Sequence, residues 1–144
     1  MKPMEYRFRP KGEYVMQAQM QELFLLAEHY KKEFSFYTDE ILFYERLIAT
    51  YNPSSNVNLA KMDQLVKNAS MLLNNIIAQI EEHLKHIAEV IQKKGDPDME
   101  QVLREEQLLM EDTLSTFADS FRTLKNALHI EVSRHIQQYV PGKN

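Results

Sequence analysis

The sequence predicts an all-α protein, an elongated up-down-up antiparallel bundle of three helices with coiled-coil-like packing. Only three glycines and five prolines interrupt the 144 residues, so turns must be few. Apolar residues in the first half alternate at steps of three and four, which keeps one face of a helix turned toward partner helices. Two segments, 52–56 and 93–98, carry strong breaking signals. We therefore expect one helical-bundle domain spanning residues 1–144.

Composition excludes several classes of protein. The formal charge of -4 is spread over both signs, without the basic stripe that nucleic-acid binding needs. The chain has no cysteine, which fits a reducing compartment. It has no secretory leader pattern at its start and no apolar run of membrane-spanning length. We expect a cytoplasmic protein that binds neither nucleic acid nor membrane.

Residues 1–13 are predicted to form a non-helical arm, because they contain two prolines, a glycine and an alternating pattern of aromatic and basic residues. The first helix should follow over residues 14–51 and end before Pro53, which disfavours helix at the preceding residue. Its buried seam is predicted to contain Met16, Met20, Leu23, Ala27, Tyr30, Phe34, Tyr37, Ile41, Tyr44, Ile48 and Tyr51.

The second helix should cover residues 58–94. Its core face is predicted to contain Leu59, Met62, Val66, Ala69, Leu73, Ile76, Ile80, Leu84, Ile87 and Ile91. Two successive steps of four around Ile80 form a stutter, which locally straightens a supercoil. Gly95 should end this helix, and Asp96 should cap the next one ahead of Pro97.

The third helix should cover residues 97–139 and stop at Pro141-Gly142. The short connection makes it an antiparallel neighbour of the second helix. Its core face is predicted to contain Leu103, Met110, Leu114, Phe117, Phe121, Leu124, Leu128, Val132, Ile136 and Tyr139.

Tyr30, Tyr37, Tyr44 and Tyr51 stand seven residues apart in the first seam. A buried tyrosine ring fills the core while its hydroxyl finds a polar partner. Counting outward from the turns places Tyr30 level with Gln79, Tyr37 level with Phe121, and Tyr51 level with His135 and Asn58. We expect the hydroxyls to reach groups of this kind at the edges of the grooves.

Histidine and carboxylate residues raise the question of chemistry. His29, His83, His86 and Glu106 are the candidate metal ligands, because His29 and His83 are expected at similar heights. Di-iron bundles need inward Glu-x-x-His pairs, and no histidine of this chain has a glutamate three residues before it. The acidic pairs, including Glu111-Asp112, are interpreted as solvated helix surface. We therefore expect no enzyme activity, no catalytic residue and no cofactor.

The first helix carries more apolar residues than its seam requires. Leu26, Phe36, Phe43 and Leu47 widen the apolar face on one side. A large exposed apolar patch usually marks an interaction surface. These four residues are the predicted interface of a homo-oligomer, unless the third helix buries them.

Part of the first helix resembles an uncharacterised family of bacterial three-helix proteins. The similarity covers about twenty residues: Glu28-His29, then Glu33-Phe34-Ser35-Phe36-Tyr37-Thr38-Asp39-Glu40-Ile41, then Arg46-Leu47. The resemblance implies a long helical bundle and brings no assigned activity.

The sequence thus favours a non-enzymatic helical bundle that acts through protein-protein association, with self-association through the widened face of the first helix. The alternative is a metal- or small-ligand-binding helical bundle. Stoichiometric metal in the purified protein would favour the alternative.

Overall fold

The computed structural model describes residues 12–93 and 96–139. This part of the chain forms the helices α2 (Gly12–Gln17), α3 (Met20–Thr50), α4 (Val57–Lys93) and α5 (Pro97–Tyr139), with a short 3-10 turn, η1 (Pro53–Ser55), between α3 and α4. The all-α prediction is confirmed. The described residues contain four α-helices packed against one another, one more than the predicted three-helix bundle.

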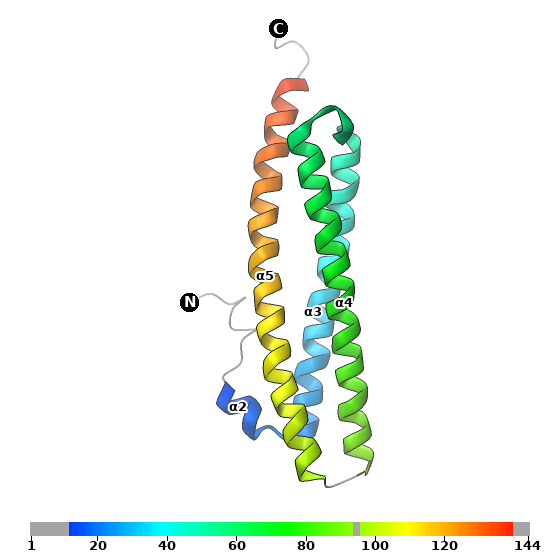
Figure 1. The fold of residues 1–144 in the computed structure, drawn as a ribbon, viewed down its shortest axis with the longest axis vertical. Coiled ribbons are helices and arrows are strands. Elements are labelled where there is room, and N and C mark those ends of the chain that lie inside the picture. The colour runs from blue at the N-terminus through cyan, green and yellow to red at the C-terminus, as the bar shows by residue number, and fades with distance from the viewer. Residues whose placement is uncertain (1–11, 94–95, 140–144) are drawn as a thin grey trace.

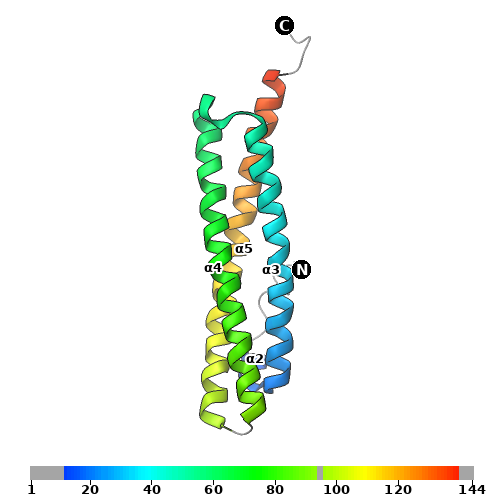
Figure 2. The same ribbon diagram turned by 90° about the vertical axis from the view of Figure 1, so that its right-hand side faces the viewer.

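The helices α3, α4 and α5 lie lengthwise beside one another, and successive helices run in opposite directions (Figures 1 and 2). The central contacts join α4 to both α3 and α5, and further contacts join α3 to α5. At about 1.5 Å of rise per residue, the 43 residues of α5 extend roughly 65 Å. The molecule is therefore an elongated stack of helices.

The short helix α2 is the main departure from the prediction. Residues 12 and 13 are helical rather than part of an arm, and the helix expected over 14–51 is broken at Ala18 and Gln19. The Glu22 carboxylate accepts a hydrogen bond from the Gln19 backbone N–H at 3.2 Å, which caps the start of α3. Beyond the break, α2 packs against α5. Residues 1–11, the rest of the predicted arm, lie outside the described part of the chain.

Two contacts hold α2 in this position. Val15 of α2 is fully buried and Ala18, at the break after α2, is 2% exposed, so both residues contribute to the core. The Arg104 Nε–H on α5 donates to the Ala18 carbonyl at 2.8 Å, satisfying a backbone acceptor at the break. The sequence signal was the Gln19-x-x-Glu22 spacing, since neither glycine nor proline marks the break.

The seam of α3 is confirmed. The structure buries Met20, Leu23, Ala27, Tyr30, Phe34, Tyr37, Ile41, Tyr44 and Ile48, which are the predicted seam residues that fall within α3. Met16 on α2 and Tyr51 after α3 are half-buried.

The core face of α4 rotates near its end. Leu59, Val66, Leu73, Ile76, Ile80, Leu84 and Ile87 are buried as predicted, whereas Met62, Ala69 and Ile91 are half-buried at the edge of the core. His83 and Val90 are buried as well, although the prediction placed neither there. The stutter around Ile80 explains this shift, because two steps of four displace the seam around the helix.

The segments between the helices contain the residues that cap the N-termini of α4 and α5. After α3, Asn52 adopts a left-handed backbone (φ 52°), and Asn56 then caps α4 by accepting from the backbone N–H groups of Asn58 and Leu59. Asp96 caps α5 by accepting from the Met99 N–H at 3.2 Å, with Pro97 as the first helical residue. The predicted cap and proline positions are confirmed, while Gly95 lies outside the described residues.

The prediction for α5 was wrong at Ile136, which is 45% exposed. His135 is buried in its place. Three further polar residues, Gln107, Glu111 and Ser115, are also buried on this helix. The side chain of Tyr139 is not among those described.

Candidate functional site

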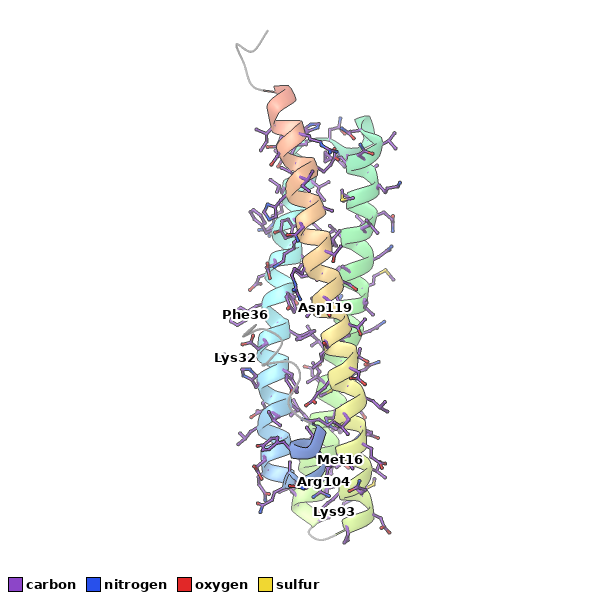
Figure 3. The ribbon with its side chains drawn as sticks, turned by 90° about the vertical axis from the view of Figure 1, so that its left-hand side faces the viewer. Met16, Lys32, Phe36, Lys93, Arg104 and Asp119 are labelled. Carbon is purple, nitrogen blue, oxygen red and sulfur yellow. The ribbon has the colours of Figure 1, made fainter. Side chains whose placement is uncertain are left out.

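An apolar strip on the outside of α3 is the strongest candidate for a functional surface. Phe36 is 57% exposed and Phe43 is 58% exposed, although both rings belong to a helix whose opposite face fills the core. Figure 3 shows Phe36 and Lys32 projecting from the outer side of α3. Leu25 is 64% exposed and lies on the same strip, since eleven residues complete about three turns. We refer to Leu25, Phe36, Phe43 and Leu47 as the α3 patch.

The four predicted interface residues therefore divide into two pairs. Leu26 and Leu47 are half-buried and pack against the core. Phe36 and Phe43 remain exposed in the single chain. Sequence reasoning missed Leu25, although its eleven-residue distance from Phe36 was visible in the sequence.

Contacts with α5 fix the orientation of this strip. The Phe43 ring packs edge-on against Tyr44, with ring centres 5.4 Å apart. The Tyr44 hydroxyl lies 3.0 Å from His129 Nε2 on α5. Glu40, between the two exposed phenylalanines, pairs with Lys125 of α5 at 3.0 Å. These contacts hold α3 so that Phe36 and Phe43 face outward beside the α3–α5 seam.

A second apolar surface lies between α4 and α5. It is a groove of about 360 Å³ lined by Leu65, Asn68, Ala69, Leu72, Ser120, Phe121, Thr123, Leu124 and Ala127. Leu65 is 43% exposed and Leu72 is 49% exposed. No lining residue is charged. We call this surface the α4–α5 groove; the sequence analysis did not predict it.

A more polar hollow of about 350 Å³ opens between α4 and α5 nearer the α4–α5 link. It is lined by Gln79, Glu82, His83, His86, Glu106, Leu109, Met110 and Thr113. His86 pairs with Glu82 of its own helix at 3.2 Å, and His83 Nδ1 lies 3.6 Å from Glu106. Carboxylates are thus already the neighbours of both imidazoles in this hollow.

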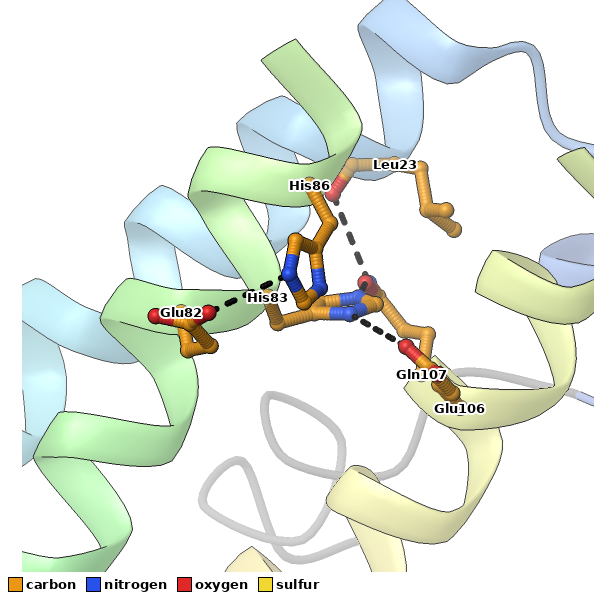
Figure 4. Close-up of polar contacts among 6 residues, drawn as sticks. All are labelled: Leu23, Glu82, His83, His86, Glu106 and Gln107. Carbon is orange, nitrogen blue, oxygen red and sulfur yellow. Dashed lines mark hydrogen bonds and ion pairs between the residues drawn. The ribbon is translucent and has the colours of Figure 1, made fainter. Parts of the chain in front are cut away.

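Hydrogen bonds from His83 extend into the core. His83 Nε2 donates to Gln107 Oε1 at 2.7 Å, and the Gln107 amide contacts the Leu23 carbonyl at 3.5 Å (Figure 4). His83 is 6% exposed and Gln107 is fully buried. This chain of contacts links α4, α5 and α3 through buried polar groups, which are stabilising only when their partners are in place.

Glu111 was predicted on solvated surface, and that prediction was wrong. Its side chain is 4% exposed, and its carboxylate accepts a hydrogen bond from the Tyr30 hydroxyl at 2.7 Å. Burial raises the pKa of the Glu111 carboxyl to about 7, and the nearby Asp112 charge adds to this, while hydrogen bonds from Tyr30 and Gln107 act in the opposite direction. Burial and the Glu111 charge also raise the pKa of Tyr30. The missed signal was the polar pair Gln107 and Glu111 standing four apart within the seam of α5.

The predicted levels of the tyrosines can be compared with their contacts. Tyr37 packs edge-on against Phe121 with ring centres 5.1 Å apart, and Tyr51 packs against His135 with ring centres 4.8 Å apart, so the levels of these two pairs are confirmed. Tyr30 bonds to Glu111 rather than Gln79, and Tyr44 bonds to His129. Polar partners therefore come from α5 for both tyrosines.

The candidate metal ligands do not form one site. His83, His86 and Glu106 line the polar hollow, whereas His29 is 44% exposed on α3 and pairs with Glu33 of the same helix. Within residues 12–93 and 96–139, no group of three or more histidine, aspartate or glutamate side chains is arranged to hold a metal ion. The expected similar height of His29 and His83 does not bring their side chains into one cluster.

Comparison of the chain with protein-family models, with curated proteins and with solved structures finds no match. No helix in the described part of the chain is both long enough and apolar enough to cross a bilayer. The α3 patch and the α4–α5 groove offer apolar contact, and the polar hollow offers hydrogen-bonding groups.

Proposed function

We propose that the protein is a non-enzymatic helical bundle that acts through protein-protein association and self-associates through the α3 patch. The observation that carries this proposal is the exposure of Phe36 and Phe43, 57% and 58%, one heptad apart on a long helix. A phenylalanine presents roughly 150 to 250 Å² of surface, so the two rings alone leave on the order of 200 Å² of apolar area in water. Exposed apolar patches of this kind usually mark interaction sites.

The arrangement of the chain supports the same proposal. We propose that α3, α4 and α5 form an elongated, antiparallel three-helix bundle with coiled-coil-like packing, to which α2 is an addition. The three-and-four spacing of the buried residues of α3 supports this packing. In such a bundle the inner face of each helix packs in the core. An aromatic residue on the outer face therefore contributes little to the stability of the fold. We place the protein in the cytoplasm, consistent with its lack of cysteine.

Sedimentation velocity over a wide concentration range tests the proposal. The wild-type chain should show a weight-average mass above the 17.0 kDa of one chain. The double variant Phe36→Glu/Phe43→Glu should remain at the mass of one chain. Burying a phenylalanine side chain stabilises a contact by about 1.5 to 3 kcal/mol, so loss of both rings should weaken association at least ~100-fold.

Met71→Glu is the matched control, because Met71 is a 69% exposed apolar residue on α4 outside both surfaces. It should associate as the wild type does. A wild-type chain that remains monomeric at the highest concentration tested would contradict the proposed function.

A further inference from the structure

The α3 patch has an acidic centre, which limits what it can pack against. Asp39 and Glu40 lie between Phe36 and Phe43. If two copies paired their patches about a two-fold axis, antiparallel helices would place residues 39 and 40 of one chain opposite residues 40 and 39 of the other. Parallel helices in register would place them opposite themselves. Glu40 is already paired with Lys125 of its own chain, so the conflict falls on the exposed Asp39, whose carboxylate would lie opposite an acidic residue of the second copy in either arrangement.

The α4–α5 groove lacks this conflict. Its lining contains no charged side chain, and its polar members, Asn68, Ser120 and Thr123, carry amide and hydroxyl groups. Amide N–H and hydroxyl groups can donate hydrogen bonds to carboxylates. An acidic pair seated over this groove therefore meets neutral, donor-bearing groups instead of a second acidic pair.

The repeat lengths of the two surfaces match. Phe36 and Phe43 are seven residues apart, or about 10.5 Å along a helix. On α4, Leu65 and Leu72 are also seven residues apart, and on α5, Ser120 and Ala127 are seven residues apart. A helix lying lengthwise in the groove thus meets Leu65 at the level of one aromatic residue and Leu72 at the level of the other.

Among the described residues, one side of the α4–α5 pair is not covered by a further helix. The helix α3 covers the other side of this pair (Figures 1 and 2). None of the residues that line the groove belongs to α3, so the groove lies on the uncovered side. In four-helix bundles a further helix occupies this kind of groove, with its apolar residues packed between the two helices. An α3 helix from another copy has the length, the outward aromatic residues and the spacing to take that position.

We infer that the α3 patch of one copy docks in the α4–α5 groove of a second copy, so that the chain assembles head to tail. This inference rests on the proposed function, self-association through the α3 patch, and adds the surface that receives it. Because the two contacting surfaces differ, each pair of chains keeps one free patch and one free groove. Assembly then continues until the chains close a ring or extend as a filament.

A mixing experiment with two variants tests the inference. Phe36→Glu/Phe43→Glu removes the patch and keeps the groove, whereas Leu65→Glu/Leu72→Glu removes the groove and keeps the patch. Each variant alone should sediment at 17.0 kDa, the mass of one chain. Mixed in equal amounts, they should form a complex of two chains that grows no further, because only one intact patch and one intact groove are present.

Two controls keep the outcome interpretable. Met71→Glu lies on α4 outside the groove and should assemble as the wild type does. Ser120→Glu places a carboxylate in the groove from α5, at an exposed residue that contributes nothing to the core, and it should repel the acidic centre of the α3 patch and behave like the Leu65→Glu/Leu72→Glu variant. Circular dichroism should show wild-type helicity for every variant used.

The possible results separate the two proposals. If both groove variants assemble as the wild type does while the patch variant stays monomeric, head-to-tail docking is overturned and the proposed function stands. If the mixture of patch and groove variants stays monomeric, docking is likewise overturned. If the wild type itself is monomeric, the proposed function fails and the inference fails with it.

Discussion

Glu111 is a buried carboxyl whose surroundings disfavour its ionised form. It lies in the core of the bundle and receives a hydrogen bond from Tyr30, and no ion pair to it is present among the described residues. A carboxyl in such surroundings favours its protonated form, because ionisation leaves a charge in a poorly solvated site. The pKa of about 7 places this ionisation within the physiological range.

The raised pKa of Glu111 predicts how stability changes with pH. Below pH 4.5, the ordinary pKa of the group, the carboxyl is protonated in both folded and unfolded chains. Between that pH and about 7 only the unfolded chain releases its proton, so the free energy of unfolding should fall as pH rises. The total change should be on the order of 3 kcal/mol, and it should level off above pH 7. Urea unfolding at pH 5, 6, 7 and 8 measures this slope.

Glu111→Gln should reduce this slope and raise the free energy of unfolding at pH 8. The glutamine amide oxygen can still accept a hydrogen bond from the Tyr30 hydroxyl, and it carries no charge. Glu105→Gln, at an exposed position on the same helix, should keep the wild-type slope. Equal slopes for the wild type and Glu111→Gln would show that Glu111 ionises normally in the folded chain.

At the level of helices, local hydrogen bonds decide where each element begins. The helix α5 starts where Asp96 accepts from the Met99 N–H, and α3 starts where Glu22 accepts from the Gln19 N–H. Both caps satisfy backbone donors that have no partner within their helix. The aspartate cap followed by proline was predictable, whereas the Gln19–Glu22 cap lacks the glycine or proline that usually identifies a break.

Asp96→Ala should lower the free energy of unfolding by about 1 kcal/mol, because the Met99 N–H loses its acceptor. Asp96→Asn retains an acceptor oxygen and should stay close to wild type. Thermal and urea unfolding of the three proteins provide the measurement. An alanine variant as stable as the asparagine variant would show that the cap contributes nothing.

The fold was predictable from the sequence where the spacing of apolar residues is regular. The buried residues of α3 followed from regular three-and-four spacing, and the contacts of Tyr37 with Phe121 and of Tyr51 with His135 followed from counting residues away from the turns. Where the pattern is irregular, prediction failed. The stutter near Ile80 brought His83 into the core, and polar residues in the seam of α5 concealed the burial of Gln107 and Glu111.

For the candidate site, the exposed pair Phe36 and Phe43 could be identified from the width of the apolar face of one helix. The α4–α5 groove could not, because it depends on two helices together. Leu65 and Leu72 are exposed apolar residues of α4, but the groove forms only where Phe121, Leu124 and Ala127 of α5 pack next to them. Only the packing of α4 on α5 reveals that Leu65, Leu72 and Ala127 border one hollow.

For the whole molecule, the length of the helices sets the shape in solution. A compact domain of this size has a radius of gyration of about 14.5 Å. A rod of roughly 60 Å, the average of the lengths of α4 and α5 at about 1.5 Å per residue, gives a radius of gyration of about 19 Å. Small-angle X-ray scattering should return the larger value for the Phe36→Glu/Phe43→Glu variant, which we expect to be monomeric. A value near 14.5 Å would contradict the extended arrangement of α3, α4 and α5.

The row of tyrosines in the seam also makes the protein its own optical reporter. The chain has seven tyrosines and no tryptophan, so its near-ultraviolet absorption and emission arise chiefly from phenol rings. Tyr30, Tyr37 and Tyr44 sit between helices at successive heights, and one of them hydrogen-bonds directly to a carboxylate. Separation of the helices at any of these heights therefore changes the light that the unlabelled protein absorbs and emits.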